Sequence, residues 1–365
     1  MKITAPSSGK ASNDYLPVLD GFRAISILCV VLSHAGNGYE KIFPGTSGVI
    51  TFFVLSGFLL TRQMIVEIET SGTLRIGGFY LRRILRLLPA LSCYIAVFTP
   101  ALLYLGTNIT RIHILSGLLY FANYYHIFTG YPPYNPMPIL WSLSVEEHFY
   151  ILFPFLMLTF RSNLRASLPV MGLLLIATLA WRLALYHICQ NHTVPICGLP
   201  GRIRTQGTDA IFDCILYGCV AALMLHYYNE STRRIFINPI AFTLAGFILL
   251  VSFAIRTPDF RETLRYSVQS ACVCIIMMNV LFGEADLFKR ILEDTRILTI
   301  GKLSYSLYLM HFGVLIAIEA THETDHLRNS SDMLLYFTLS FMLAVCSYLL
   351  VEQPMAVIRR KIRKK

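Results

Sequence analysis

Long uncharged apolar stretches recur along this chain of 365 residues and limit what it can fold into. Val170–Trp181, Ile240–Ile255 and Leu334–Val351 contain no Asp, Glu, Lys or Arg. Only 14% of all residues are charged, whereas a soluble domain has about a quarter. The chain has too little polar surface for a water-exposed globule, so we expect an integral membrane protein in a lipid bilayer.

Ten segments have the length of about 17–25 residues that a membrane-spanning helix needs. They are Leu16–Ala35, Ser47–Ile65, Ile84–Tyr104, Ser142–Phe160, Leu168–Tyr186, Asp209–Tyr227, Pro239–Ile255, Leu264–Phe282, Lys302–Ala320 and Met333–Val351. An eleventh, His113–Phe128, is short and rich in Tyr, His and Asn, so we expect it to dip into the membrane or lie on its surface. The expected fold is all-α: one polytopic membrane helical bundle of about ten transmembrane helices plus this re-entrant or interfacial segment, in a single domain over residues 1–365.

Topology explains the net charge of +10, because Lys and Arg collect in loops that stay cytoplasmic. The connection Arg75–Arg86 and the tail 355–365 are strongly basic, so we expect both in the cytoplasm together with residues 1–15. With ten spans, 21 of the 31 Lys and Arg residues lie inside and 8 outside. This distribution predicts that both termini are cytoplasmic. The membrane character of the chain excludes a nucleic-acid-binding protein despite the net charge.

The cysteines indicate neither a metal site nor a secreted disulfide scaffold. No CxxC or Cys/His metal spacing occurs. Seven of the nine cysteines lie in apolar segments, where a thiol behaves as a small hydrophobe. Cys189 and Cys197 share a polar loop, and the sequence leaves open whether an oxidising compartment links them in a disulfide.

The first span contains two ionisable residues, which are costly inside a membrane and therefore mark a candidate functional site. Arg23 and His34 are eleven residues apart, which is about three helical turns and roughly 16 Å along one face. They can line one polar groove without touching. Alternatively, Arg23 pairs with Asp20 one turn away, and His34 is an interfacial residue.

The fourth span opens with two adjacent carboxylates, Glu146 and Glu147. Ser144 and Glu147 fit a capping box, in which the Glu side chain reaches back to the cap amide. That arrangement gives Glu147 a structural role. Glu146 has no such role and is the better catalytic candidate.

The ninth span carries a polar stripe of Gly301, Ser304, Tyr308 and His311 at three- and four-residue spacing. A packed seam of small and hydroxyl residues would look the same. His311 is the residue that such a seam explains least.

Further charges fall in other spans. Asp209 and Asp213 share a face of the sixth span, where they can bind Arg204 or cap the helix. Arg182 and Glu352 are buried-charge candidates whose partners the sequence does not identify.

A basic cluster of Arg82, Arg83 and Arg86 precedes the third span. Arg83 and Arg86 are one turn apart and form a fork suited to phosphate oxygens. A cytoplasmic anchor for the third span explains the same cluster. We interpret the C-terminal Lys/Arg run as topology and lipid contact.

Together these segments resemble the membrane acyltransferase-3 family, whose members O-acylate carbohydrates and related acceptors. The matching stretches follow the family's order between about Leu16 and Pro354 and are Leu19–Ala24, the Arg23-x10-His34 spacing, Phe52–Phe58, Phe79–Pro89, Trp141–Tyr150, Ile300–His311 and Glu352–Pro354. The sixth span matches less well: Asp213 and Gly218 fit, but Ile211 stands where an Arg often precedes that Asp. We expect no fused extracytoplasmic hydrolase-like domain of the kind that some relatives carry.

The resemblance implies an acyl-CoA donor used from the cytoplasm and an acceptor hydroxyl presented on the opposite side. A CoA nucleotide is too highly charged to enter the bilayer, so it would bind at Arg82, Arg83 and Arg86. Its thin pantetheine arm would pass Arg23 and bring the thioester to His34.

The resemblance also implies site roles. His34 would be the general base, and Glu146 would orient its imidazole. Ser56 and Tyr308 are candidate donors to the developing oxyanion, with His311 beside them as a further substrate or oxyanion candidate. A covalent acyl-His intermediate is equally compatible with the sequence.

With this resemblance, the sequence predicts an O-acyltransferase of a bacterial inner (plasma) membrane, foremost an O-acetyltransferase. We expect it to use acetyl-CoA or another acyl-CoA and to modify a sugar of a cell-surface or secreted glycan or a lipid-linked sugar. One alternative acceptor is a small-molecule glycoside. A different alternative is a proton-coupled transporter or flippase with a path through Arg23, His34, Glu146 and His311. The chain lacks the paired broken helices in corresponding halves that usually indicate a transporter.

Overall fold

The chain is all-helical in a computed structural model, which describes residues 15–36, 43–189, 197, 201–324, 327 and 329–363. Residues 1–14 of the expected N-terminal segment and residues 364–365 of the tail lie outside the described residues. The helices of the first half are α1 (Pro17–His34), α3 (Gly45–Ser71), α4 (Ile76–Tyr104), α5 (Arg111–Leu118), α6 (Ala122–Thr129), a 3₁₀ turn (Met137–Leu140), α7 (Trp141–Thr159) and α8 (Ser167–Ile188). Those of the second half are α9 (Arg202–Gln206), α10 (Thr208–Ile211), α11 (Asp213–Tyr227), α12 (Asn229–Phe236), α13 (Pro239–Ala254), α14 (Pro258–Glu262), α15 (Leu264–Phe282), α16 (Asp286–Leu292), α17 (Thr295–His322), α18 (Ser330–Ser347), a π-helical turn (Tyr348–Glu352) and α19 (Gln353–Arg363).

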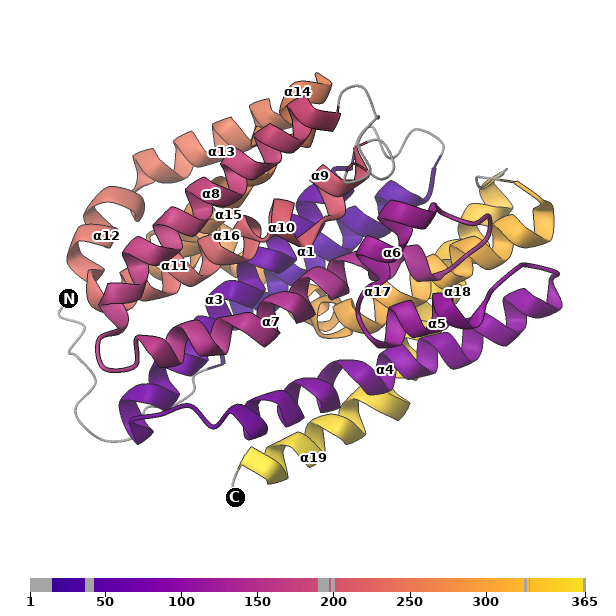
Figure 1. Cartoon of the computed structure of the whole chain (residues 1–365), viewed down its shortest axis with the longest axis horizontal. Coiled ribbons are helices and arrows are strands. Elements are labelled where there is room, and N and C mark those ends of the chain that lie inside the picture. The colour runs from indigo at the N-terminus through magenta and orange to yellow at the C-terminus, as the bar shows by residue number, and fades with distance from the viewer. Residues whose placement is uncertain are drawn as a thin grey trace.

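The expected membrane bundle is confirmed. Within the described residues, seven helices are long and apolar enough to cross a membrane, and an eighth results if α12 and α13, bent by 58°, form one span. Two of the ten expected spans fall outside this count: α7 carries Glu146 and Glu147 near its start, and α11 has only 15 residues. In Figure 1 both run among the long helices.

The expected interfacial segment forms two short helices instead of a span. Helices α5 and α6 have eight residues each, about 12 Å of helix, which is too short to cross a bilayer. Tyr120 turns the chain between them with φ of 57°. The segment therefore adds no crossing, as the sequence predicts.

Helix α1 lies at the centre of the bundle, packed between α3 and α17. Glycine allows the close approach on the α17 side, because a Cβ atom on Gly301 would stand 2.0 Å from the carbonyl oxygen of Asp20. On α11, a Cβ atom on Gly218 would stand 2.0 Å from the carbonyl oxygen of Val54 in α3. Small residues at such seams let membrane helices pack closely, so the polar stripe of the ninth span faces α1.

A buried ion pair joins α8 to α11. The side chains of Arg182 and Asp213 are fully buried, and two hydrogen bonds of 2.9 Å connect them. Ser267 of α15 donates to the same carboxylate at 2.6 Å. The suggestion that Asp213 binds Arg204 is therefore wrong, and the partner of Arg182 is now identified.

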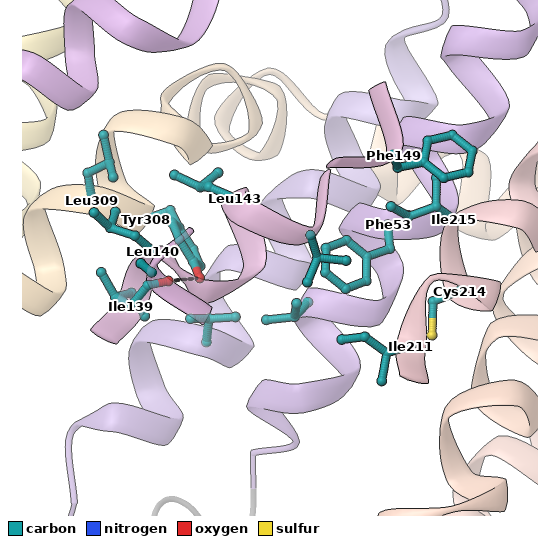
Figure 2. Packing of buried hydrophobic residues seen from close by; sticks show 14 of the residues in the cluster. Phe53, Ile139, Leu140, Leu143, Phe149, Ile211, Cys214, Ile215, Tyr308 and Leu309 are labelled. Carbon is teal, nitrogen blue, oxygen red and sulfur yellow. Dashed lines mark hydrogen bonds between the residues drawn. The ribbon is translucent and has the colours of Figure 1, made fainter. Parts of the chain in front are cut away.

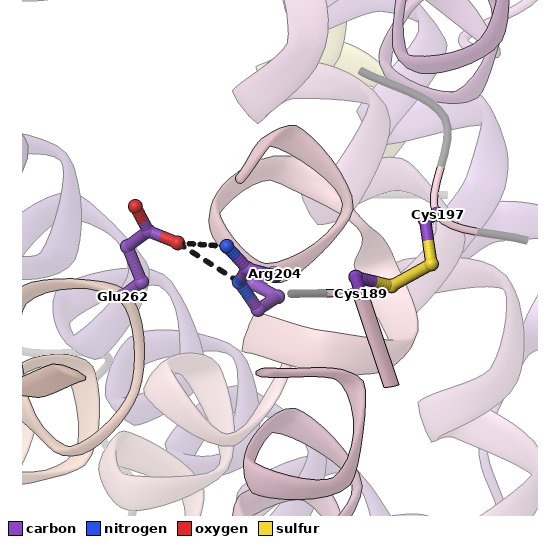
Figure 3. Close-up of a disulfide and its surroundings, with 4 residues drawn as sticks. All are labelled: Cys189, Cys197, Arg204 and Glu262. Carbon is purple, nitrogen blue, oxygen red and sulfur yellow. Dashed lines mark hydrogen bonds and ion pairs between the residues drawn. A yellow bond between two sulfur atoms is a disulfide. The ribbon is translucent and has the colours of Figure 1, made fainter. Parts of the chain in front are cut away.

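The polar loop after α8 is cross-linked. Cys189 and Cys197 form a disulfide, which answers the question that the sequence left open. Figure 3 shows it beside the ion pair between Arg204 and Glu262. Helix α8 ends at the end of the bundle where α1 ends and α3 begins, which we call the His34 end. The opposite end, where α4 begins and α19 lies, is the Arg83 end (Figure 1).

Candidate active site

Two histidines from distant parts of the sequence meet at the His34 end. His34 is the last residue of α1, and His311 is fully buried in α17. The Nδ1 atom of His34 lies 3.1 Å from the Nε2 atom of His311. The close packing of α1 against α17 thus brings together two of the sequence-predicted site residues.

Hydrogen bonding determines which nitrogen of each ring carries the proton. The Nδ1–H of His311 donates to the carbonyl oxygen of Leu307 at 2.8 Å, because a carbonyl can only accept. The Nε2 atom of neutral His311 is then an acceptor, so the proton between the rings belongs to Nδ1 of His34. The Nε2 atom of His34 keeps its lone pair and can take up a proton.

His34 lines a cavity of about 450 Å3, the histidine cavity. Other lining residues include Ser33, Ser47, Val49, Ile139, Trp141, Gln206, Arg256, Arg261, Arg265, Gln269 and Tyr308. Its volume lies within the range of about 300–1,000 Å3 that small-molecule sites occupy. Part of the wall is fixed by hydrogen bonds, since Ser47 donates to Gln269 at 2.6 Å and Gln269 donates to Ser252 at 2.9 Å.

The hydroxyl of Tyr308 is already engaged. It donates to the carbonyl oxygen of Ile139 at 2.9 Å (Figure 2) and therefore accepts from Ser142 at 2.6 Å. Figure 2 also shows Leu140, Leu143 and Leu309 packed around this group. Tyr308 holds the 3₁₀ turn against α17, and its proton is not directed into the cavity in this arrangement.

Glu146 lies in a second, smaller cavity of about 80 Å3, the narrow cavity. Its carboxylate accepts a hydrogen bond from Ser56 of α3 at 2.7 Å. Arg23, Arg83 and Arg86 line the same cavity. Within the described residues no hydrogen bond joins Glu146 to His34. The two residues, which were expected to be partners, line neighbouring cavities and do not contact each other.

Arg23 also forms the expected local pair. Its guanidinium lies 2.6 Å from the carboxylate of Asp20, three residues earlier. Both alternatives for Arg23 therefore hold together, because the same side chain also faces the narrow cavity.

The basic cluster forms a third cavity of about 280 Å3 at the Arg83 end, the arginine cavity. Helix α4 begins at Ile76, before the expected start at Ile84, so Arg82, Arg83 and Arg86 are on one helix and line this cavity. Arg83 is held over the ring of Tyr150, 4.2 Å from its centre. Arg82 lies 3.3 Å from Glu67.

The tail contributes two arginines to the arginine cavity, which the sequence did not reveal. Helix α19 packs along α4, and Arg359 and Arg360 line the cavity with Ala356. The sequence indicated only lipid contact and topology for this run. The helical 3.6-residue periodicity of this run was a signal in the sequence that it forms an amphipathic helix. Nothing in the sequence indicated that this helix packs on α4.

The three cavities adjoin one another in a row. Arg83 and Arg86 line both the arginine cavity and the narrow cavity. Val49 and Tyr308 line both the narrow cavity and the histidine cavity. The three cavities are therefore neighbours, in an order that runs from the arginine cluster to His34.

Two sequence interpretations at this site are corrected. Helix α7 begins at Trp141 without a side-chain cap, and Ser144 donates to the carbonyl oxygen of Leu140 at 3.1 Å, so the capping box with Glu147 is wrong. The preceding 3₁₀ turn starts the helix earlier than Ser144. Asp209 neither binds Arg204 nor caps a helix, and accepts hydrogen bonds from Tyr124 and Trp181 at 2.5 Å each.

Outside the spans, a tyrosine fixes one wall of the histidine cavity. Tyr131, in the loop after α6, donates to Gln206. Burial raises the pKa of the Tyr131 hydroxyl, so this group stays a donor. Glu352, the other charge that was expected to be buried, is half-buried and accepts a hydrogen bond from Ser306.

The comparisons with known proteins agree on one family. The acyltransferase-3 family model (Acyl_transf_3), described as an acyltransferase domain, matches residues 16–352. O-acetyltransferase OatA of Staphylococcus aureus strain NCTC 8325 / PS 47 is 27% identical over 367 residues, which cover 95% of this chain and 58% of that protein. OatA of strain COL gives the same values, and another protein of strain COL is 28% identical over 362 residues.

The chain spans 57–58% of the length of these relatives. No solved structure matches it with significance. Because the family model covers the chain from the start of α1 to the end of the π-helical turn, the chain belongs to the acyltransferase-3 family of membrane O-acyltransferases.

Proposed function

We propose that this protein transfers an acetyl group from acetyl-CoA in the cytoplasm to a sugar hydroxyl of a cell-surface or secreted glycan on the other side of the membrane. The observation that carries the proposal is the row of cavities from the arginine cluster to His34. Acetyl is favoured as the acyl group because relatives are named O-acetyltransferases. A small-molecule glycoside would use the same site.

The arginine cavity suits the nucleotide of the donor. Arg82, Arg83, Arg86, Arg359 and Arg360 line it, and guanidinium groups pair with phosphate oxygens through two parallel hydrogen bonds. Of these five arginines, only Arg82 has a carboxylate of the described residues within ion-pair distance. The other guanidinium groups are available to phosphates.

The narrow cavity suits the pantetheine arm. Its volume of about 80 Å3 is too small for a nucleotide, so in our proposal only the thin arm of the donor enters it. Glu146 offsets part of the positive charge of Arg23, Arg83 and Arg86 there, so its role is to balance and position these groups. Ser56 fixes that carboxylate.

His34 performs the proton transfer. Its Nε2 atom takes the proton of the acceptor hydroxyl while the hydroxyl oxygen attacks the thioester carbonyl carbon. The carbon–sulfur bond then breaks, and the imidazolium returns the proton to the leaving thiolate, giving CoA-SH and the sugar ester. His311 Nε2 accepts from Nδ1–H of His34 throughout and stabilises the transient imidazolium.

The disulfide supports the orientation. Cys189 and Cys197 are bridged at the His34 end, and structural disulfides persist in oxidising compartments. The Arg83 end carries the basic connection before α4 and the basic tail, which favour the cytoplasm. Both observations support the donor inside and His34 outside.

The function is tested by an assay with a labelled donor and by the substitution of a single histidine. Purified protein in nanodiscs should release CoA-SH from radiolabelled acetyl-CoA and transfer the label to a glycan acceptor. His34→Ala should lower the rate by about 10²–10⁴-fold, the usual contribution of a general base, while insertion and melting temperature persist. His187→Ala, an exposed histidine at the same end, is the matched control.

Two outcomes would contradict the proposal. Full activity of His34→Ala removes this histidine from the chemistry. A protein that carries sugar or protons across vesicles without cleaving the thioester is a transporter.

A further inference from the structure

Arginines gather where the histidine cavity opens at the His34 end. Arg256, Arg261 and Arg265 line this cavity, and no Asp or Glu is among its described lining residues. An adjoining cavity of about 330 Å3, the rim cavity, is lined by the same Arg261 and Arg265 together with Arg202 and Glu262. We call the two cavities together the cationic entrance, because four arginines and one carboxylate line it.

The carboxylates near this entrance have other partners. Glu262 accepts two hydrogen bonds from Arg204 (Figure 3). Asp259 accepts one from Tyr186. Within the described ranges no carboxylate forms an ion pair with Arg261 or Arg265.

Arg265 uses only part of its hydrogen-bonding capacity. Its guanidinium interacts with Tyr266, 5.5 Å from the ring centre, but its Nε atom is buried and has no hydrogen-bond partner among the described residues. Leaving a buried charged donor without an acceptor is costly. A bound anion would supply the missing acceptor.

Topology does not explain this cluster. In the proposed orientation the His34 end faces outward, where Lys and Arg are depleted. Five arginines nevertheless fall between positions 202 and 265 in the two loops at that end: Arg202, Arg204, Arg256, Arg261 and Arg265. The donor does not explain them either, since its phosphates would bind at the opposite end.

We infer that the acceptor carries an anionic group, a carboxylate or a phosphate, which Arg261 and Arg265 hold while a hydroxyl of the same molecule reaches Nε2 of His34. This inference rests on the proposed function and specifies its acceptor class. Guanidinium pairs with either anion through two parallel hydrogen bonds. Trp141 lines the same cavity and offers an apolar face to the sugar ring.

A matched set of acceptors tests the inference. The protein in phosphatidylcholine nanodiscs is given acetyl-CoA with methyl glucoside, methyl glucuronide or methyl glucoside 6-phosphate. The wild type should use at least one anionic acceptor with a kcat/KM about tenfold or more above that of the neutral glucoside, and the better of the two identifies the anion. In Arg261→Gln/Arg265→Gln this ratio should fall by about tenfold or more, the size of one charge-assisted hydrogen bond.

Two controls isolate the charge. Arg265→Lys keeps the charge and should retain part of the preference. Arg111→Gln removes an exposed arginine at the same end that lines neither cavity and should leave the ratio unchanged. The preference should also weaken with added salt, because the anion is held by charge.

Binding is measured independently of turnover. Glucuronide or glucoside 6-phosphate should raise the melting temperature of the wild type more than glucoside does, and the double variant should lose this difference. Equal use and equal binding of the three compounds, or a preference that persists in the double variant, overturns the inference. An effect of the double variant that appears only when phosphatidylglycerol is added assigns the arginines to lipid instead.

Failure of the proposed function gives a different result. In that case no compound would stimulate His34-dependent release of CoA-SH, whereas the binding assay would still report whether Arg261 and Arg265 hold an anion.

Discussion

At the scale of single residues, the contact between His34 and His311 determines the chemistry that this site can perform. The two residues are 277 positions apart, and no spacing rule connects them. The sequence identified each as a candidate, but it assigned the orienting role to Glu146. The carboxylate bonds to Ser56 instead, so a neutral imidazole occupies the place where many general bases have an acidic partner.

His311 should be a positioning residue whose loss affects catalysis rather than donor binding. His311→Ala removes the acceptor that fixes the tautomer of His34, so we expect kcat to fall by about 100-fold or more with an unchanged KM for acetyl-CoA. His311→Gln places an amide near the position of Nε2 and should recover part of kcat.

Melting temperatures separate this effect from a packing defect, because His311 is fully buried. If the variants His311→Ala and His311→Gln lose kcat and melting temperature in parallel, His311 only supports the fold. A rise in KM with constant kcat would assign it to substrate binding.

At the scale of helices, the tail helix α19 is part of the donor site in our proposal. Arg359 and Arg360 reach the arginine cavity only because α19 packs along α4. Arg359→Gln/Arg360→Gln should raise the KM for acetyl-CoA by about tenfold or more, since charge-assisted contacts to phosphate are lost.

A truncated donor identifies what α19 contacts. S-acetyl-pantetheine lacks the nucleotide, so its KM should be the same in the wild type and the double variant. Lys361→Gln, an exposed neighbour on α19 that does not line the cavity, is the control. An equal change for both donors would mean that α19 supports the fold and not the nucleotide.

At the scale of the whole molecule, the two ends of the bundle should face opposite compartments. Arg111 on α5 is exposed at the His34 end, and Lys289 on α16 is exposed beside the start of α1. A membrane-impermeant maleimide should label Arg111→Cys in intact cells and Lys289→Cys only after lysis. Both variants are made in a Cys346→Ser protein, because Cys346 is the exposed free cysteine among those described. The reverse labelling pattern would contradict the orientation.

Hydropathy was sufficient to predict the fold class, because membrane-spanning helices are long and uncharged. It was insufficient where tertiary contacts decide. The predicted capping box at Ser144 does not form, because a 3₁₀ turn starts α7 earlier in the sequence. The partner of Arg182 and the neighbours of Arg359 come from helices that no local pattern specifies.

The narrow cavity has a consequence for the cell as well as for the reaction. A protein that connects both faces of an energised membrane risks short-circuiting the ion gradients that the cell maintains. The narrow cavity holds only about 80 Å3, and its three arginines, Arg23, Arg83 and Arg86, outnumber its one carboxylate, Glu146. Fixed positive charge repels protons and metal cations from a pore. In our proposal, the guanidinium groups that guide an anionic donor would therefore also hinder a leak of cations.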